Sequence, residues 1–468
     1  MLSATFRADG SSKFGKNNKW GYFPAVSAAW RIKEEKWFAD LTWLSDLKVR
    51  AGYGLAGNNR IGSYNSLAMM NAIMAAMGGS VKPGYVASNI PNPDLKWEAN
   101  KTFNFGIDFG AFNQRITVSP EFYINESNDL LLNALVPLSS GYTTMLLNAG
   151  ATRNIGIDLA ISSVNFSSPQ FSWRTTLNLS HNKNKVVRLT GESRQLYEAR
   201  FGFNQSTHLL EVGAPVGQFY GFETEGLYQV SDFNYNERTR TYTLKEGVPC
   251  QGNAATVRPG MWKFRDRDGN GVIDENDKAV IGNASPKIYG GLTNNFFYRN
   301  FDLSVFLTFS IGNDVLNATK LINAKTGVQN TTALAVSSSS NRWMTINAAG
   351  DIVTDPAELE ALNRGKTIAA YYDMEQGDNY IHSWAVEDAS YLKLSNITLG
   401  YTFPERRISR LGLKKLRLYF TGHNLACLTK YSGFDPEVST MRSGLTPGVD
   451  FGAYPLSRSF IFGLNVTF

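Results

Sequence analysis

The C-terminal stretch of the chain alternates between apolar and polar side chains, and this pattern is the strongest constraint on the fold. Within residues 457–468, every second position carries a large apolar side chain: Phe460, Phe462, Leu464, Val466 and Phe468. The positions between them are small or polar, with Ile461 as the exception. A period of two places side chains on opposite faces of a strand, whereas a helix needs a period near 3.6. The stretch is therefore predicted to be a strand.

An apolar strand of this kind is compatible with two architectures. Its unpaired edge would aggregate in water unless something covered it. A membrane β-barrel pairs every edge and buries the apolar face in lipid. The last strand of a soluble β-sandwich shows the same alternation, so this stretch alone leaves both interpretations open.

Alternating segments recur along the whole chain of 468 residues. We predict about twelve strands from them, at residues 2–7, 26–32, 47–53, 103–110, 115–124, 154–162, 171–180, 288–298, 301–309, 397–403, 416–423 and 459–468. Pro120 lies inside one of these segments. Because proline has no N–H for the sheet ladder, we expect a β-bulge there.

The connections between these strands have their own pattern, in which short turns alternate with long loops. The longest predicted loops span residues 189–285 and 313–388. Outer-membrane barrels have short periplasmic turns and long extracellular loops, whereas a soluble sandwich has no reason to gather its long loops at one end. The pattern therefore predicts an all-β antiparallel transmembrane barrel, with its apolar stripes against lipid. It places six charged side chains in the lumen: Arg50, Asp108, Glu121, Asp158, Arg174 and Arg417.

Composition agrees with this prediction. The mean hydropathy is −0.23, and no run of about 18 apolar residues predicts a transmembrane helix. Alternating strands average their two faces to a hydropathy near zero, so this value fits a membrane barrel. The net charge is only +6, and no basic run suggests nucleic acid as a partner.

The N-terminal residues carry no targeting signal. Residues 1–7 already alternate like a strand and contain neither the basic nor the apolar region of a signal peptide. An outer-membrane protein needs a signal peptide. We therefore expect this chain to be a fragment of a longer protein or to begin at an internal start.

Six short segments resemble one family, the SusC/RagA-type TonB-dependent transporters of Bacteroidota outer membranes. They are FPAVSAAWR (23–31), LKVRAGYG (47–54), GQFYGF (217–222), DRDGNG (266–271), YLKLSNITLGY (391–401) and GHNL (422–425). The segments occur in order along essentially the whole chain. Members of the family have an N-terminal plug, a segment that contacts TonB and a barrel of about 22 strands with a plugged lumen. This chain is similar only to the C-terminal part of such a barrel, so the resemblance implies that the plug, the TonB segment and roughly ten strands lie elsewhere.

The resemblance also implies a function and partners. It implies TonB-dependent import of a nutrient such as an oligosaccharide or peptide across the outer membrane of a Gram-negative cell. A SusD-like surface lipoprotein would capture the substrate over the loops, and TonB would act through the N-terminal region. Two alternatives stay open: a passive porin or adhesin barrel, and a secreted calcium-binding β-rich binding protein.

Residues 266–277 form the most specific local motif. They follow the calcium-loop pattern D-x-D-x-N-G, which arranges hard oxygen ligands around one Ca²⁺ ion. The candidate metal ligands are Asp266, Asp268, Asn270, Val272 through its carbonyl, Asp274 and Asp277. Gly271 allows the sharp turn that the loop needs. An EF-hand usually has glutamate where this loop has Asp277, and a surface turn without metal is the alternative.

No pattern in the sequence predicts an enzyme. The four histidines, His181, His208, His382 and His423, are scattered, and no nucleophile, phosphate-binding or dinucleotide-binding motif occurs. His423 is expected to be a satisfied lumen residue. Cys250 and Cys427 form no metal or redox spacing, and whether they pair stays open. Aromatic residues of the long loops can either stack on sugar rings or pack the loops together: Tyr220, Phe222, Tyr228, Trp262, Tyr371, Tyr372 and Trp384.

Overall fold

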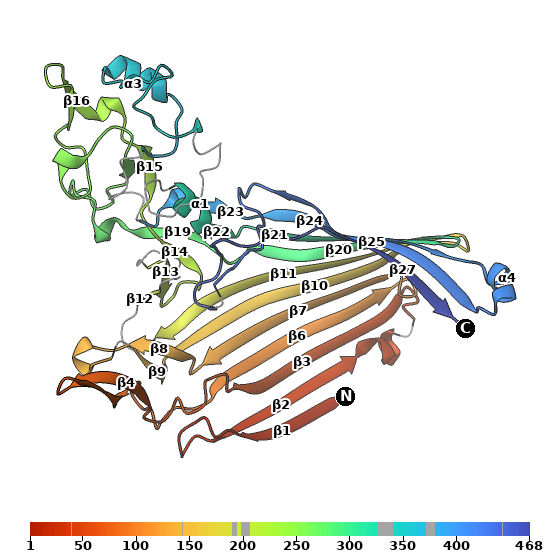
Figure 1. Cartoon of the computed structure of the whole chain (residues 1–468). Coiled ribbons are helices and arrows are strands. Elements are labelled where there is room, and N and C mark those ends of the chain that lie inside the picture. The colour runs from red at the N-terminus through yellow and green to blue at the C-terminus, as the bar shows by residue number, and fades with distance from the viewer. Residues whose placement is uncertain are drawn as a thin grey trace.

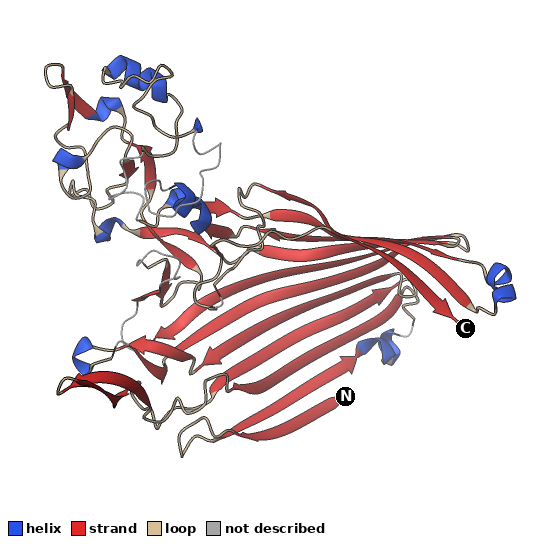
Figure 2. Cartoon of the chain, viewed as in Figure 1, coloured by secondary structure: helices blue, strands red, loops and turns tan. Residues whose placement is uncertain are grey.

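The protein, seen here as a computed structural model, is built around one twelve-stranded antiparallel sheet (Figures 1 and 2). The structure describes residues 1–38, 40–142, 144–189, 194–197, 206–324, 340–370, 380–441 and 443–468. In sheet order the strands are β1 (Leu2–Gly10), β2 (Trp20–Arg31), β3 (Leu44–Asn58), β6 (Glu98–Ala111), β7 (Ile116–Asn128), β10 (Gly150–Ser167), β11 (Phe171–Leu189), β20 (Ile288–Tyr298), β21 (Phe301–Ile311), β24 (Tyr391–Thr402), β25 (Lys415–Thr429) and β27 (Ser459–Thr467). The prediction of about twelve antiparallel strands is confirmed.

Each sheet strand pairs with the next sheet strand along the chain, as in an up-and-down barrel wall. The sheet curves, and β1 and β27 form its two edges (Figure 1). The intervening strands run from 11 residues in β20 and β21 to 19 residues in β11. A tilted strand of about 9–11 residues is long enough to cross a bilayer, so each of these strands reaches that length.

The register assigns the side chains to two faces. Arg50 lies opposite Gly106, Gly106 opposite Glu121, and Glu121 opposite Asp158. Directly opposite residues share a face, so this row of polar positions lies on one side of the sheet. Away from the register shifts that interrupt the pairing of β3 with β6, β10 with β11, β21 with β24 and β24 with β25, the same alternation continues the polar face across the sheet.

The predicted bulge at Pro120 is wrong. Pro120 lies opposite Leu159 of β10 in a regular register. On its other side, the pairing with β6 is interrupted between Gly106–Glu121 and Phe109–Val118, and it resumes in the same register. The missing N–H of proline therefore interrupts the ladder without inserting an extra residue.

The connections gather by type at the two ends of the sheet. The turn end holds residues 32–43, 112–115, 168–170, 299–300 and 403–414, with η1 (Ile32–Glu34), η2 (Lys36–Phe38), α4 (Glu405–Ile408) and η8 (Ser409–Leu411). The loop end holds the described parts of residues 11–19, 59–97, 129–149, 190–287, 312–390 and 430–458. Two of these loops form hairpins, β4 (Met70–Met77) with β5 (Ser80–Ala87), and β8 (Leu131–Leu135) with β9 (Thr144–Asn148). The length pattern fails once, because 11–19 is shorter than 32–43 at the opposite end.

Three long loops fold together beyond the loop end of the sheet (Figure 2). We call the described parts of residues 206–286, 313–390 and 430–458 the loop body. Its elements are β13 (His208–Glu211), β14 (Gln218–Gly221), β15 (Thr224–Leu227), η4 (Val230–Asp232), β16 (Phe233–Asn236), β17 (Thr241–Leu244), η5 (Ala254–Thr256), β18 (Trp262–Phe264), η6 (Glu275–Asp277), β19 (Ala279–Asn283), β22 (Asp314–Asn317), α1 (Ala318–Ala324), α3 (Pro356–Asn363), η7 (Ser383–Ala385), β23 (Val386–Asp388) and β26 (Val449–Asp450). The short strand β12 (Arg194–Tyr197) pairs with β13 at its margin.

Several apolar cores hold the loop body together, and two of them join the first long loop to the others. In one core, Phe219 of the first loop packs with Leu316 and Ile381 of the second and Val449 of the third. In the other, the first loop contributes Phe222, Leu227, Trp262, Phe264 and Ile273, and the second contributes Trp343, Val353, Leu359, Ala369 and Ala370. Within the described part of the chain, no helix is both long and apolar enough to span a membrane.

Candidate functional site

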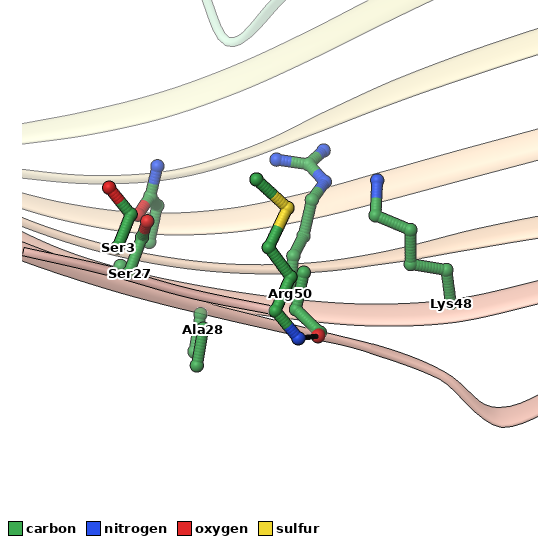
Figure 3. A pocket seen from close by; sticks show the side chains of 10 residues that line it. Ser3, Ser27, Ala28, Lys48 and Arg50 are labelled. Carbon is green, nitrogen blue, oxygen red and sulfur yellow. Dashed lines mark hydrogen bonds between the residues drawn. The ribbon is translucent and has the colours of Figure 1, made fainter.

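The polar face of the sheet carries a cluster of charges near β1 (Figure 3). Arg50 on β3 contacts Glu121 of β7 at 2.5 Å and Asp108 of β6 at 3.5 Å, and Lys48 lies 3.0 Å from the same Asp108 carboxylate. A Cβ on Gly106 would lie 2.7 Å from the Arg50 guanidinium carbon, so glycine leaves room for this side chain over β6. Figure 3 shows Lys48 and Arg50 on one side of the sheet and Ala28 on the other.

A second ion pair lies on the same face near the C-terminal edge. Arg417 of β25 binds Asp302 of β21 through two hydrogen bonds, at 3.0 Å from Nε and 2.5 Å from Nη2. Two parallel bonds fix both side chains along the wall. Asp158 lies opposite Glu121, and Arg174 lies opposite Asn295. All six charged residues predicted to face the lumen are therefore on one face of the sheet.

The other face is apolar and exposed. Its large side chains include Phe105, Ile157, Leu399, Leu418 and Leu464, all of which are at least 39% accessible. A surface this large and this apolar would be unusual in contact with water, because soluble proteins rarely expose such continuous apolar patches. Lipid is the solvent that suits this face, and water suits the charged one.

The predicted calcium loop is folded into a tight turn at residues 266–271. The Asp266 carboxylate accepts hydrogen bonds from the N–H groups of Gly269 at 2.7 Å and Gly271 at 2.8 Å. Both bonds lower the pKa of Asp266, and the bond from Gly271 has the larger effect. Both glycines have positive φ, +73° and +83°, which favours glycine over other residues.

The structure brings together three of the six predicted ligands. One oxygen each of Asp266, Asp268 and Asp277 lies within 4.8 Å of the others. Asp277 is fully buried, and it closes the loop by accepting hydrogen bonds from the N–H groups of Arg267 at 2.7 Å and Asp274 at 2.8 Å. Hard carboxylate oxygens at this spacing fit Ca²⁺ as a donor set.

The other three predicted ligands make local contacts. Asn270 accepts a hydrogen bond from the N–H of Val272 at 2.7 Å, and Val272 forms a parallel bridge with Cys250. Asp274 caps η6 by accepting the N–H of Asn276 at 2.8 Å. In this arrangement Asp266, Asp268 and Asp277 are the residues that would hold a metal.

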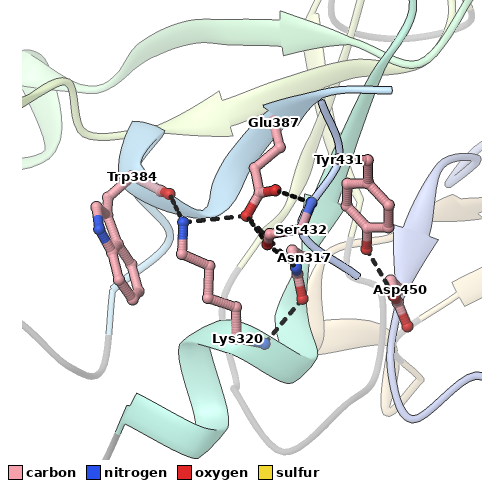
Figure 4. A network of polar contacts seen from close by, with 7 residues as sticks. All are labelled: Asn317, Lys320, Trp384, Glu387, Tyr431, Ser432 and Asp450. Carbon is pink, nitrogen blue, oxygen red and sulfur yellow. Dashed lines mark hydrogen bonds and ion pairs between the residues drawn. The ribbon is translucent and has the colours of Figure 1, made fainter. Parts of the chain in front are cut away.

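A polar network ties the second and third loops together within the loop body (Figure 4). Lys320 of α1 donates to the Trp384 carbonyl at 2.9 Å and pairs with Glu387 at 3.0 Å. Ser432 donates two hydrogen bonds to Glu387, both at 2.8 Å. Burial alone would raise the pKa of Glu387, but the bonds from Ser432 and the charge of Lys320 lower it overall.

The same network includes a buried tyrosine. Tyr431 donates to Asp450 at 2.5 Å, and burial together with this bond raises the pKa of the phenol. Thr319, beside Lys320 in α1, donates to the Asp450 carbonyl at 3.2 Å. Sequence spacing gave no signal for these contacts, because the partners are 19 to 131 residues apart.

The histidines have structural roles where they are buried. His208 contacts Thr207 at 2.8 Å and the Pro447 carbonyl at 2.9 Å, and burial lowers its pKa to about 4. His382 is packed against Trp262 and contacts Thr224 at 2.8 Å, and burial, with the nearby charge of Lys320, lowers its pKa to about 3. His423 lies in the lumen row and contacts Asn396 at 3.2 Å. Both rings with lowered pKa are neutral at physiological pH.

The loop aromatics mostly pack inside the loop body. Tyr220, Phe222, Tyr228 and Trp262 are each at most 6% accessible, so their faces are not free to stack on a sugar. Trp384 is half-buried, with Lys320 4.1 Å from its ring centre. Tyr371 and Tyr372 lie outside the described residues. Cys250 is buried, Cys427 is exposed, and both are free thiols.

These features together define a class of protein. A curved antiparallel wall with one charged face, one exposed apolar face and its longest loops at one end is an outer-membrane β-barrel wall. A family model described as TonB dependent receptor-like, beta-barrel, matches residues 1–244. The chain belongs to this family, and it is an outer-membrane protein. From the loop lengths that are usual in such barrels, we expect the loop end to be extracellular and the turn end to be periplasmic.

Relatives place the chain near the SusC/RagA type, which confirms the resemblance seen in the sequence. TonB-dependent receptor P3 of Formosa agariphila is 35% identical over 475 residues, which are all of this chain and 44% of that protein. TonB-dependent receptor SusC of Bacteroides thetaiotaomicron is 30% identical over 483 residues, with 100% of this chain and 42% of that protein covered. These relatives are receptors, in agreement with the prediction that the chain is not an enzyme.

A solved structure gives the same fold. The structure of the RagAB peptide transporter matches with a TM-score of 0.78 and 23% identity, and the match covers 100% of this chain and 46% of that chain. The chain thus spans less than half the length of the curated relatives and of this structure.

Proposed function

We propose that this barrel segment serves in the TonB-dependent import of a nutrient, such as an oligosaccharide or peptide, across the outer membrane. The observation that carries the proposal is the wall itself, with a continuous charged lumen face and a folded loop body over its extracellular end. Charged side chains that pair along the wall, as Arg50 does with Glu121, keep the lumen hydrated. A hydrated lumen suits a polar solute that is too large for a narrow pore.

The proposal includes two protein partners. A SusD-like surface lipoprotein would cover the loop body and deliver substrate to the lumen, and TonB would supply energy through a region outside this chain. Family membership and the fold shared with RagA support these partners. The loop body is suited to be a docking platform because two apolar cores and the Lys320–Glu387–Ser432 network hold three loops in one arrangement.

Uptake by cells that carry the complete receptor tests this function. Fluorescent maltoheptaose and a fluorescent casein digest would be offered to cells with and without TonB. We expect at least one probe to accumulate only when both the receptor and TonB are present. Accumulation that is equal without TonB would instead indicate a passive porin, and binding without accumulation would indicate an adhesin.

We further propose that residues 266–277 bind Ca²⁺ as a structural ion. The specific support is that one carboxylate oxygen each of Asp266, Asp268 and Asp277 lies within 4.8 Å of the others. The turn at residues 266–271 also contains two glycines with positive φ. Ile273 lies within the same loop and is buried in the core shared by the first two long loops. A bound ion would therefore stabilise the loop body next to that core.

Loss of the carboxylates should abolish a calcium effect on the loop body. Asp266→Ala combined with Asp268→Ala removes two of the three ligands while leaving the buried Asp277 in place. We expect Ca²⁺ to slow proteolysis of the loop body at least several-fold in the unchanged receptor and to have no effect in the variant. Proteolysis that is independent of Ca²⁺ in both proteins would identify the loop as a turn without metal.

A further inference from the structure

A cavity of about 540 Å³ lies between the barrel wall and the loop body at the extracellular end. Asn182, Tyr289, Ser310 and Tyr391 line it from the wall, on β11, β20, β21 and β24. Tyr289 lies opposite Ser310, and Ser310 lies opposite Tyr391, so these residues belong to the lumen row. The cavity therefore opens on the path between the loop body and the lumen.

Four stretches of the loop body form the remaining lining, at residues 284–286, 313–315, 436–439 and 447–448. Their close packing is visible at Gly448, which has a φ of +70° and where an added Cβ would lie 2.6 Å from the Ala284 side chain. Ser285 also donates to the Val216 carbonyl at 3.3 Å. The lining is thus held by contacts between different loops and does not depend on one loop alone.

Asp314 is a half-buried carboxylate in this lining. One of its oxygens accepts the N–H of Asn283 at 2.9 Å. Within the described residues no lysine or arginine forms an ion pair with it, and the exposed Lys287 acts on it only through its more distant charge. Burial and the neighbouring Asp388 raise the pKa of Asp314, whereas the bond from Asn283 and the charge of Lys287 lower it, and the net shift is upward. A carboxylate in this setting is stabilised by any cation that reaches it.

Glu437 is the second carboxylate of the lining, and the lysine that pairs with it also lies near Asp435. Lys393 of β24 contacts Glu437 and lies 3.7 Å from Asp435, and the Tyr391 hydroxyl also donates to Glu437. Lys393 is 8% accessible, so its ammonium group does not reach the cavity as a free charge. The described lining residues include two carboxylates and no lysine or arginine.

We propose that this cavity binds the ammonium group of a peptide substrate, with Asp314 as its anionic partner. This inference rests on the proposed import function and narrows its substrate class. An ammonium group would give Asp314 the ion-pair partner that it lacks among the described residues, and Tyr289, which is 39% accessible, lies at the wall as an additional polar contact. An anionic glycan would be repelled by both carboxylates. A neutral sugar would leave the charge of Asp314 uncompensated.

Binding to the purified complete receptor tests the inference without requiring transport. The probes are trialanine with a free amino terminus, N-acetyl-trialanine and maltotriose, measured by calorimetry. We expect trialanine to bind at least about tenfold more tightly than the acetylated form, as a hydrogen-bonded charge pair implies. Asp314→Asn should remove this preference and weaken trialanine binding by about the same factor, while keeping an oxygen for the Asn283 N–H.

Two results would overturn the inference. One is equal affinity, or equal absence of binding, for trialanine and its acetylated form. The other is an unchanged preference in Asp314→Asn. Glu225→Gln, which changes an exposed carboxylate outside the cavity, is the matched control and should bind like the unchanged receptor. Uptake of maltoheptaose that depends on TonB, without any preference for the free amino terminus, would contradict the ammonium site while leaving the import function intact.

Discussion

Replacing Leu464 with arginine should strongly reduce assembly of the receptor in the outer membrane, whereas Asn465→Arg should be tolerated. Leu464 lies on the apolar face of β27, opposite Leu418, and is 58% accessible. Asn465 lies on the lumen face, opposite Arg417. An arginine on the lipid face costs up to about 2–4 kcal/mol at the bilayer midplane, and the cost falls toward the interfaces. An arginine in the hydrated lumen has no such cost.

The measurement is the amount of heat-modifiable folded receptor in the outer-membrane fraction. We expect the Leu464→Arg band to be several-fold weaker than the Asn465→Arg band at equal expression. The two positions are neighbours in the same strand, so each variant controls for the other. Equal yields would show that the two faces of β27 are not distinguished by lipid.

Replacing Gly221 with alanine should open the loop body. Gly221 ends β14, and an added Cβ would lie 2.2 Å from the Ile381 carbonyl oxygen of the second loop. That oxygen accepts the N–H of Phe222 at 2.9 Å, and the N–H of Ser383 donates to the Phe222 carbonyl at 2.9 Å. The contact is backbone against backbone, so no side-chain rotation relieves it. Overpacking of this kind costs about 1–3 kcal/mol.

Limited proteolysis of the folded receptor measures this effect. We expect cleavage within the loop body to be about tenfold faster in Gly221→Ala, because each 1.4 kcal/mol of local opening free energy changes the open population tenfold. Gly444→Ala is the matched control, since an added Cβ there meets no atom within 4 Å. Cleavage at the same rate in both variants would mean that the first two long loops do not depend on this junction.

The barrel wall could be predicted from the sequence because the pattern that defines each strand lies within that strand. Alternation along 459–468 and along eleven other segments fixes which side chain faces lipid, and the register then follows from short turns such as 299–300. The prediction failed at Pro120, where the absence of an N–H interrupts the ladder without a bulge. It also failed at residues 11–19, whose length gives no indication that they lie at the loop end.

The loop body could not be predicted because its contacts join distant residues. The Lys320–Glu387 pair, the Tyr431–Asp450 bond and the core around Trp343 each combine loops that have no periodic pattern. The turn at 266–271 was visible because its donors and acceptors lie within a few residues of one another. The burial of Asp277, in contrast, depends on the surrounding loop body.

The central claim is that one face of this sheet contacts lipid and the other lines a hydrated lumen. Spin labels on adjacent residues of β10 test it most directly, at Ile157 and at Asp158, in the complete receptor with Cys250 and Cys427 replaced by serine. We expect the label at 157 to collide with oxygen dissolved in the bilayer and to be protected from a water-soluble nickel chelate, and we expect the opposite behaviour for the label at 158. Equal accessibility of both labels to the nickel chelate would show that the two faces do not meet different solvents.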